Sequence, residues 1–145
     1  MTDINRNVEG FKSLYHSMNR ENLDFNNIST VYADDIHFED CFHSIEGINN
    51  LFDYFKNLYS NVSFIEFTFI HQWADESSAM ITWDMLYQHP KLNKGEKILV
   101  KGASELTFLE GKIIKHRDYF DAGSLLYEHI PLLNRIILFL KNRMA

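Results

Sequence analysis

The part of the sequence that decides the fold is Lys112-Ile113-Ile114-Lys115-His116-Arg117-Asp118-Tyr119-Phe120-Asp121. A β-strand points alternate side chains to opposite faces, so Ile114, His116, Asp118 and Phe120 are predicted to share one face. The Glu110-Gly111 pair directly before it predicts a tight turn, which makes the stretch the second arm of a hairpin. A histidine and an aspartate among apolar neighbours are costly to bury unless they pair or act. The stretch therefore predicts both a strand and a candidate site.

The first half of the chain is expected to be mainly helical. Apolar residues recur at helical spacing in three segments, which predicts helices over residues 4–19, 25–32 and 48–59. Between the last two, alternating residues 36–43 predict a strand with Ile36, Phe38, Asp40 and Phe42 toward the core, followed by a loop at residues 44–47.

The second half changes to the two-residue period of strands. Four consecutive antiparallel strands are predicted, at Val62–Trp73, Ser78–Gln88, Glu96–Leu109 and Lys112–Phe120. A final helical segment over residues 125–143 is interrupted by Pro131, which kinks or restarts the helix. Its basic, amphipathic second part is expected to be a lid or packing element over the cavity mouth or a dimer partner, with membrane binding as the lesser alternative.

This order of elements predicts an α+β domain in which helices pack on one face of an antiparallel sheet. A sheet that covers three helices must curl, and a curled sheet closed by helices leaves a conical, mostly apolar cavity of the kind that small molecules occupy. The sequence contains no repeat, linker or low-complexity tract, so residues 1–145 are expected to form a single domain.

Composition narrows the class of protein. The formal net charge of −6 argues against nucleic acid as a partner, because phosphate binding needs a concentrated basic face. The single cysteine, Cys41, excludes an intramolecular disulfide and suits a reducing compartment. The N-terminus has no signal-peptide core, and the longest apolar run, Ile136 to Leu140, is too short to span a bilayer. We therefore expect a soluble, cytoplasmic protein.

Two motifs carry a family resemblance: Tyr32-Ala33-Asp34-Asp35 before the first strand, and Arg117-Asp118-Tyr119-Phe120-Asp121 in the last. With the order of elements, they make residues 5–125 resemble the nuclear transport factor two-like superfamily, in particular its SnoaL-like branch. Limonene epoxide hydrolase and ketosteroid isomerase are related members. The resemblance implies a cone-shaped fold that binds a small, largely apolar molecule without a cofactor.

The resemblance also implies roles for single residues. Asp40 falls where ketosteroid isomerases keep the aspartate that shuttles a proton, but Leu14 and Ser104 stand where those enzymes have a tyrosine and an aspartic acid. Asp118 matches a catalytic aspartate of limonene epoxide hydrolase, whereas Phe38 and Asp40 replace its water-holding tyrosine and asparagine. The catalytic arginine falls near Asp84. The chain thus keeps some of the catalytic residues of ketosteroid isomerase and some of those of limonene epoxide hydrolase.

Asp40, Asp118 and His116 are the candidate catalytic residues. If the two aspartates share an apolar cavity, one can act as an acid and the other as a base, with Asp40 as the candidate general base and His116 supporting Asp118. Proton abstraction next to a carbonyl, dehydration and water addition are the reactions this allows. The alternative is a non-catalytic dimerising or ligand-sensing module with structural carboxylates. The candidate ligand-binding residues are Tyr15, Phe38, Leu58, Asp84, Val100, Gly102, Ser104, Leu106 and Phe120.

Asp84 presents a conflict that leads to a prediction about assembly. Its strand carries Ala79, Ile81, Trp83, Met85 and Tyr87 on the other, more apolar face, which turns Asp84 away from the core, whereas the family alignment turns it toward the pocket. The two indications are compatible if the outer face of the sheet is buried as well, by a second subunit that contacts Trp83, Met85 and Tyr87. We therefore expect a homodimer. His37, Glu39, Cys41 and His43 also share a strand face, which we interpret as a solvated or interface-facing edge rather than a metal site.

Overall fold

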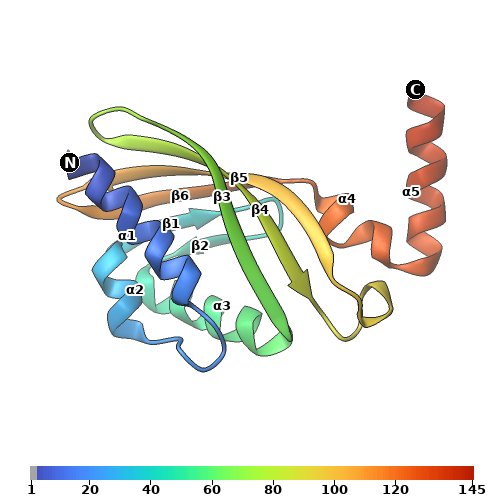
Figure 1. Ribbon diagram of the computed structural model, residues 1–145, viewed down its shortest axis with the longest axis horizontal. Helices are drawn as coiled ribbons and strands as arrows, with labels where there is room; N and C mark the ends of the chain where they lie inside the picture. Colours follow the sequence, from blue (N-terminus) through green and yellow to red (C-terminus); the bar gives the residue numbers. More distant parts are fainter. Residues whose placement is uncertain (1–2) are drawn as a thin grey trace.

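A computed structural model describes residues 3–145 and contains a single curled sheet of six strands in the order β2-β1-β6-β5-β4-β3 (Figure 1). The α+β architecture predicted from the sequence is confirmed. The strands are β1 (Tyr32–Glu39), β2 (Ser44–Glu46), β3 (Phe64–Ala74), β4 (Ser78–Gln88), β5 (Ile98–Leu109) and β6 (Lys112–Phe120). Strands β3 to β6 pair antiparallel in sequence order, as expected, whereas β1 lies parallel to β6. The sheet is therefore mixed.

Three helices pack on one side of the sheet: α1 (Asp3–Ser17), α2 (Phe25–Val31) and α3 (Ile48–Asn61) (Figure 1). Each is amphipathic or short and places its apolar residues inward; α1 buries Val8, Phe11 and Leu14. Asp24 caps α2 by accepting a hydrogen bond from the amide of Asn26. Together with the inner side chains of the sheet, these helices form the main core at one end of the molecule.

The prediction for the strand at residues 36–43 needs correction at both ends. The strand begins at Tyr32, which is fully buried, and it ends at Glu39. Asp40 and Phe42 therefore lie in a turn, and residues 44–46 of the expected loop form β2, which pairs with β1. The buried tyrosine brings a phenol into the interior beside β6.

Strand β6 contains a β-bulge that changes which residues face inward. Thr107 of β5 pairs with Lys115, whereas the next residue, Phe108, pairs with Ile113, so Ile114 is an extra residue without a direct partner. As a result Ile113 and His116 are the buried positions, and the prediction that Ile114 shares the inner face with His116 is wrong. A strict two-residue alternation could not reveal the bulge.

The C-terminal segment does not form the predicted lid over the cavity of its own chain. Residues 122–144 form a short helix α4 (Ala122–Leu125), a 3-10 turn η2 (Tyr127–His129) and the helix α5 (Pro131–Met144). Helix α5 extends away from the body of the molecule, and none of its residues is buried (Figure 1). Pro131 starts a new helix here because Ile130 before it is extended, as residues that precede proline prefer. Within the chain α5 does not cover the cavity. No helix among residues 3–145 has the length and apolarity needed to cross a membrane.

Candidate functional site

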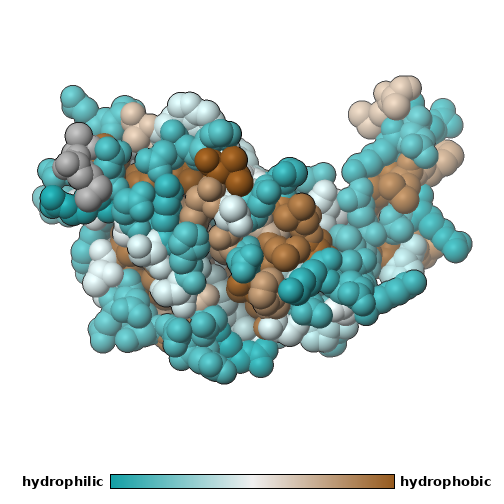
Figure 2. Space-filling view, in the orientation of Figure 1, coloured by the Kyte–Doolittle hydropathy of each residue, from teal (hydrophilic) through white to brown (hydrophobic). Residues whose placement is uncertain are grey.

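A cavity of about 320 Å³ opens between the concave face of the sheet and helices α1 and α3. Its volume lies at the lower end of the range for small-molecule sites. Aromatic and aliphatic side chains dominate its wall, and two carboxylates interrupt them. In the space-filling view, apolar side chains gather over the strands in the centre of the body and again along α5 (Figure 2). The lining residues include Tyr15, Phe38, Asp40, Phe42, Tyr54, Leu58, Tyr59, Trp83, Met85, Tyr87, Asp118, Phe120, Leu125 and Leu126.

Asp118 of β6 is fixed on one side by the neighbouring strands. Its Oδ1 atom accepts a hydrogen bond from the Ser104 hydroxyl at 2.5 Å, and the Ser104 Oγ accepts one from Trp83 Nε1 at 3.0 Å. An indole nitrogen can only donate, so the single hydrogen of Ser104 is directed to the carboxylate. The register places Ser104 opposite Asp118 and Gly102 opposite Trp83, so three strands build this arrangement.

His116 holds the same carboxylate oxygen from within β6. Its Nε2 lies 2.6 Å from Asp118 Oδ1, and its Nδ1 lies 2.8 Å from the Tyr32 hydroxyl. The Tyr32 hydroxyl is in turn 2.8 Å from that of Tyr15. With an ionised Asp118 and a neutral imidazole, every hydrogen in this chain points one way: Tyr15 donates to Tyr32, Tyr32 to Nδ1, and Nε2 to Asp118.

This chain of hydrogen bonds begins and ends at the cavity, because Tyr15 and Asp118 both line the cavity. Every hydrogen bond that the described residues make to the Asp118 carboxylate goes to Oδ1. The Asp118 side chain is 18% exposed, whereas that of His116 is fully buried. Oδ2 is therefore the oxygen that remains for a molecule in the cavity.

The buried phenols stay neutral. Burial raises the pKa of Tyr15 and of Tyr32 well above the usual value, and the neighbouring Asp118 charge adds to the effect at both. The pKa of Tyr59, another lining residue, is raised in the same way, first by burial and then by Asp118. At neutral pH these tyrosines therefore add no second charge beside Asp118, and Tyr15 and Tyr32 donate their hydroxyl hydrogens within the chain of hydrogen bonds.

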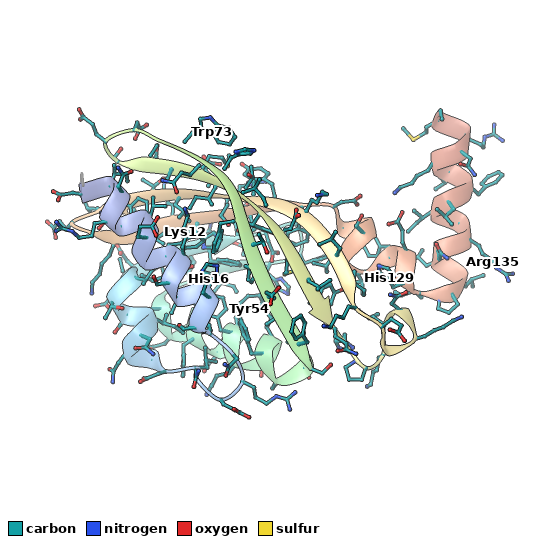
Figure 3. All side chains as sticks on the ribbon, viewed as in Figure 1. Lys12, His16, Tyr54, Trp73, His129 and Arg135 are labelled. Atoms are coloured by element: carbon teal, nitrogen blue, oxygen red, sulfur yellow. The ribbon has the colours of Figure 1, made fainter. Side chains whose placement is uncertain are left out.

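Asp40 also lines the cavity, but its hydrogen bonds are of another kind. Its Oδ1 accepts from the backbone amides of Phe42 and His43 at 2.8 and 2.7 Å, which closes the turn after β1. The His43 Nδ1 lies 3.1 Å from Oδ1, and the Tyr54 hydroxyl lies 3.4 Å from Oδ2. Figure 3 labels Tyr54, which comes from α3 beneath the sheet. Asp40 is thus tied into the turn that borders the cavity.

The structure divides the candidate ligand-binding residues into two groups. Tyr15, Phe38, Leu58 and Phe120 line the cavity together with Asp40 and Asp118. Val100, Gly102, Ser104 and Leu106 of β5 lie behind the wall instead. Gly102 leaves room for the Trp83 ring, since a Cβ atom there would come within 2.3 Å of it. Ser104 and Leu106 are buried beneath the lining layer, so these β5 residues support the wall rather than form it.

Asp84 does not reach the cavity. Its side chain lies on the outer face of the sheet and forms an ion pair with Lys101 at 3.2 Å. Trp83, Met85 and Tyr87 face inward and line the cavity, so the prediction that they form a dimer interface is wrong. The strand alternation was informative, because the more apolar face of β4 is the one that looks into the cone. A homodimer through the outer face stays a prediction.

Sequence reasoning missed part of the site. The sequence predicts Tyr32 at the end of a helix and Trp83 on the outer face of the sheet, whereas Tyr32 bonds His116 behind the cavity and Trp83 lines it. The alternation of β4 was a usable signal for Trp83, whereas the Tyr32-Ala33-Asp34-Asp35 motif gave no indication that Tyr32 bonds His116. Among residues 3–145 no group of three or more His, Cys, Asp or Glu side chains is arranged to hold a metal ion.

Comparison with known proteins agrees with this architecture. Residues 11–116 match the SnoaL-like domain family. The chain belongs to that family. A search of curated proteins found no match to this SnoaL-like domain.

Many solved structures share the fold of this SnoaL-like domain. An NTF2-like protein of unknown function from Burkholderia pseudomallei superposes with a TM-score of 0.75 at 11% identity, covering 90% of this chain and 99% of that one. An LEH-like epoxide hydrolase from M. tuberculosis gives 0.67 at 19% identity, with 92% and 93% covered. A protein with a ketosteroid isomerase-like fold from Catenulispora acidiphila, in complex with trimethylamine, gives 0.71 at 14% identity, with 85% and 91% covered. At these identities the likeness establishes the fold.

Proposed function

We propose that this SnoaL-like domain binds a small, largely apolar molecule in the cavity and transfers a proton to and from it with Asp118. The observation that carries the proposal is the fixed Oδ1 atom of Asp118, held by Ser104 and His116, beside an Oδ2 atom left to the cavity. A general base must be held in position and must reach the proton that it takes. Asp118 meets both conditions.

The proposed chemistry begins with an ionised Asp118. Ser104 and His116 hold Oδ1 in place, and Oδ2 takes a proton from a carbon next to a carbonyl or from a water molecule. The carbonyl oxygen gains negative charge as the proton leaves, and a neutral hydroxyl of the wall such as that of Tyr59 can stabilise this charge. The return of the proton to another atom gives isomerisation or loss of water. Abstraction from a water molecule gives water addition.

Asp40 serves a different role in this proposal. Oδ1 of Asp40 accepts from two backbone amides of the turn, and its Oδ2 lies 3.4 Å from the Tyr54 hydroxyl, so both oxygens already have partners. We assign it to the turn that borders the cavity and to the negative charge of the wall, in place of the general-base role expected from the sequence. Asp118 is the candidate base because its hydrogen bonds within the described residues all go to Oδ1, which leaves Oδ2 for a substrate proton.

The alternative function is ligand binding without catalysis. It is favoured by the same hydrogen bonds, since both carboxylates have partners that a purely structural group would also have. In that case Asp118 would anchor three strands, and the cavity would hold a sensed or carried molecule. Only the catalytic function requires the Oδ2 atom of Asp118 to take a proton.

The test combines a binding probe with a proton-exchange assay. N-phenyl-1-naphthylamine, a neutral apolar fluorophore, reports occupancy of the cavity, and loss of α-protons of α-tetralone in heavy water, followed by NMR, reports proton abstraction. We expect the wild-type protein to bind the fluorophore and to accelerate exchange. Asp118→Asn should retain binding and lose roughly 10²-fold or more of the acceleration. Asp84→Asn, on the outer face, is the matched control and should retain both.

The outcomes separate the functions. Exchange at the wild-type rate in Asp118→Asn would remove Asp118 from the mechanism. Binding of the fluorophore by a wild-type protein that accelerates no exchange would support the non-catalytic alternative. Absence of binding together with absence of exchange would contradict the proposed small-molecule site itself.

A further inference from the structure

Helix α5 exposes a long apolar stripe to solvent. Leu132, Ile136, Phe139 and Leu140 follow one another at steps of four, three and one residues and therefore lie along one side of the helix. Their exposed fractions are 73%, 49%, 58% and 52%, which is unusual for four large apolar side chains on one helix. Figure 2 shows this apolar surface on the arm that stands away from the body.

A helix of this length is not stable by itself. Isolated helices shorter than about 12–15 residues are marginal in water, and most helix stability in proteins comes from packing of an apolar face. Helix α5 has 14 residues and buries none of them against its own chain. Its stability therefore depends on a surface that the single chain does not provide.

The charge of α5 indicates which kind of surface the helix packs against. Residues 131–145 contain Arg135, Lys141 and Arg143 and no acidic residue, so they carry +3. Because the whole chain carries −6, the remaining residues carry −9. A basic helix is attracted to an acidic body of this kind. An anionic membrane would attract α5 but would repel the body behind it.

The opening of the cavity offers apolar contacts with the matching charge. Phe42 lines the cavity and is 36% exposed, and its ring centroid lies 6.0 Å from that of Tyr127, which is 37% exposed. We call Phe42 and Tyr127 the rim. The lining residues of the described chain include Asp40 and Asp118 but no lysine or arginine. A helix with an apolar stripe and basic flanks complements such a rim.

The helix cannot easily fold back onto its own rim. The residue before a proline is held in extended conformation, and Ile130 has φ −104° and ψ 117°. Lys141 forms a 2.5 Å ion pair with Glu128, which fastens α5 to the η2 turn. Figure 3 shows Arg135 pointing away from the body. These features keep α5 extended outward, where a second molecule can meet it.

From these observations we infer that α5 packs across the cavity rim of a second copy of this chain, and that the exchange is reciprocal. Each protomer then supplies the cover for the other's cavity, so that the site is complete only in the dimer. The inference does not depend on the reaction proposed for Asp118. It differs from dimerisation through the outer sheet face, which would leave α5 exposed.

Disulfide trapping tests the inference, because the single native cysteine, Cys41, is exposed and directly precedes Phe42 of the rim. Ile136→Cys and Leu140→Cys are made separately in the full chain and oxidised mildly. We expect a covalent dimer at twice 17.2 kDa on a non-reducing gel, at a yield well above that of the wild type. Leu99→Cys, at an exposed position on the outer sheet face, is the matched control and should give little dimer.

A second measurement uses no cysteine chemistry. Sedimentation equilibrium should show a dimer for the wild type and for Leu99→Glu, and a weakening of at least tenfold for Ile136→Glu, whose side chain is half exposed and not needed for folding. Four results would overturn the inference: an intrachain Cys41 disulfide, equal trapping by Leu99→Cys, a monomeric wild type, or weakening by Leu99→Glu alone. Flotation of the wild type with anionic vesicles, with no dimer in their absence, would assign α5 to a membrane and would overturn it as well.

Discussion

Substitution of Asp118 by asparagine and by alanine should differ in its effect on stability but have the same effect on proton transfer. The Asp118 Oδ1 atom accepts from Ser104 and from His116 Nε2. An asparagine side chain keeps an acceptor oxygen at this position and places its amide group where Oδ2 was. We therefore expect Asp118→Asn to change the free energy of unfolding by about 1 kcal/mol or less, because neither donor is left without an acceptor.

Alanine removes the acceptor altogether. The Ser104 hydroxyl and the His116 Nε2–H then lose their partner in a region where both side chains are buried. Each unpaired buried group costs about 1–3 kcal/mol, so we expect a loss of about 2–6 kcal/mol for Asp118→Ala. The lower half of this range is more realistic, since the 18% exposure of Asp118 lets water take its place. For a chain of this length, a loss of about 3 kcal/mol lowers Tm by about 6–12 °C.

The assay is urea unfolding followed by tryptophan fluorescence, with thermal melting by circular dichroism as a second probe. Trp83 is a direct reporter because its Nε1 donates to Ser104. A loss in Asp118→Asn as large as that in Asp118→Ala would refute the reasoning, because it would mean that the negative charge itself stabilises the fold. Loss of proton exchange in both variants with normal stability only in the asparagine variant would confirm it.

Further predictions concern the wall and its tyrosines. Gly102→Ala should destabilise the protein by about 1–3 kcal/mol and weaken probe binding, because the added Cβ would overlap the Trp83 ring. An alanine variant with unchanged melting and binding would show that the ring has room to move. Asp84→Ala should change stability by less than about 0.5 kcal/mol and leave probe binding unchanged, since its ion pair with an exposed lysine lies outside the cavity; weaker probe binding would place this side chain at the site. The raised pKa values of Tyr15 and Tyr32 keep both phenols neutral in the folded state while the unfolded chain ionises near pH 10. The contribution of these two phenols to stability should therefore be constant below about pH 10 and fall above it. Because Tyr119 and Tyr127 are exposed, the test compares the wild type with Tyr15→Phe and Tyr32→Phe: the tyrosinate absorbance that each variant lacks should appear in the wild type only on unfolding, and its appearance in the folded protein would contradict their burial.

Most of the fold could be predicted from the sequence because the apolar periodicity is strong. The helical stripe of α3 and the alternation of β4 and β6 are regular enough that the bounds of β4 and β6 matched the structure. The end of β1 could not be predicted, since Asp40 and Phe42 continue the alternation of the strand even though the chain turns there. The turn depends on the carboxylate of Asp40 binding two amides, which is a local geometry and not a pattern of apolarity.

The site could be predicted only in part for a related reason. Asp118 and His116 stood out because polar groups on an apolar strand face are costly. Tyr32 did not stand out, because a tyrosine is ordinary in either a helix or a strand and only the parallel pairing of β1 with β6 brings it to His116. The wall formed by β4 was indicated by the more apolar face of that strand, but the family alignment of Asp84 favoured the opposite orientation.

The bulge at Ile114 also separates two parts of the β5–β6 hairpin that would otherwise have to share one alignment. Near the turn, Leu109 lies opposite Lys112, and at the site Ser104 lies opposite Asp118; these two pairings differ by one residue in their offset. The extra residue, Ile114, accounts for this one-residue difference in register. A hairpin with one residue more in its turn and without Ile114 would keep Ser104, His116 and Asp118 in their present alignment, so the tip of the hairpin can change in length during evolution or design while the site remains intact.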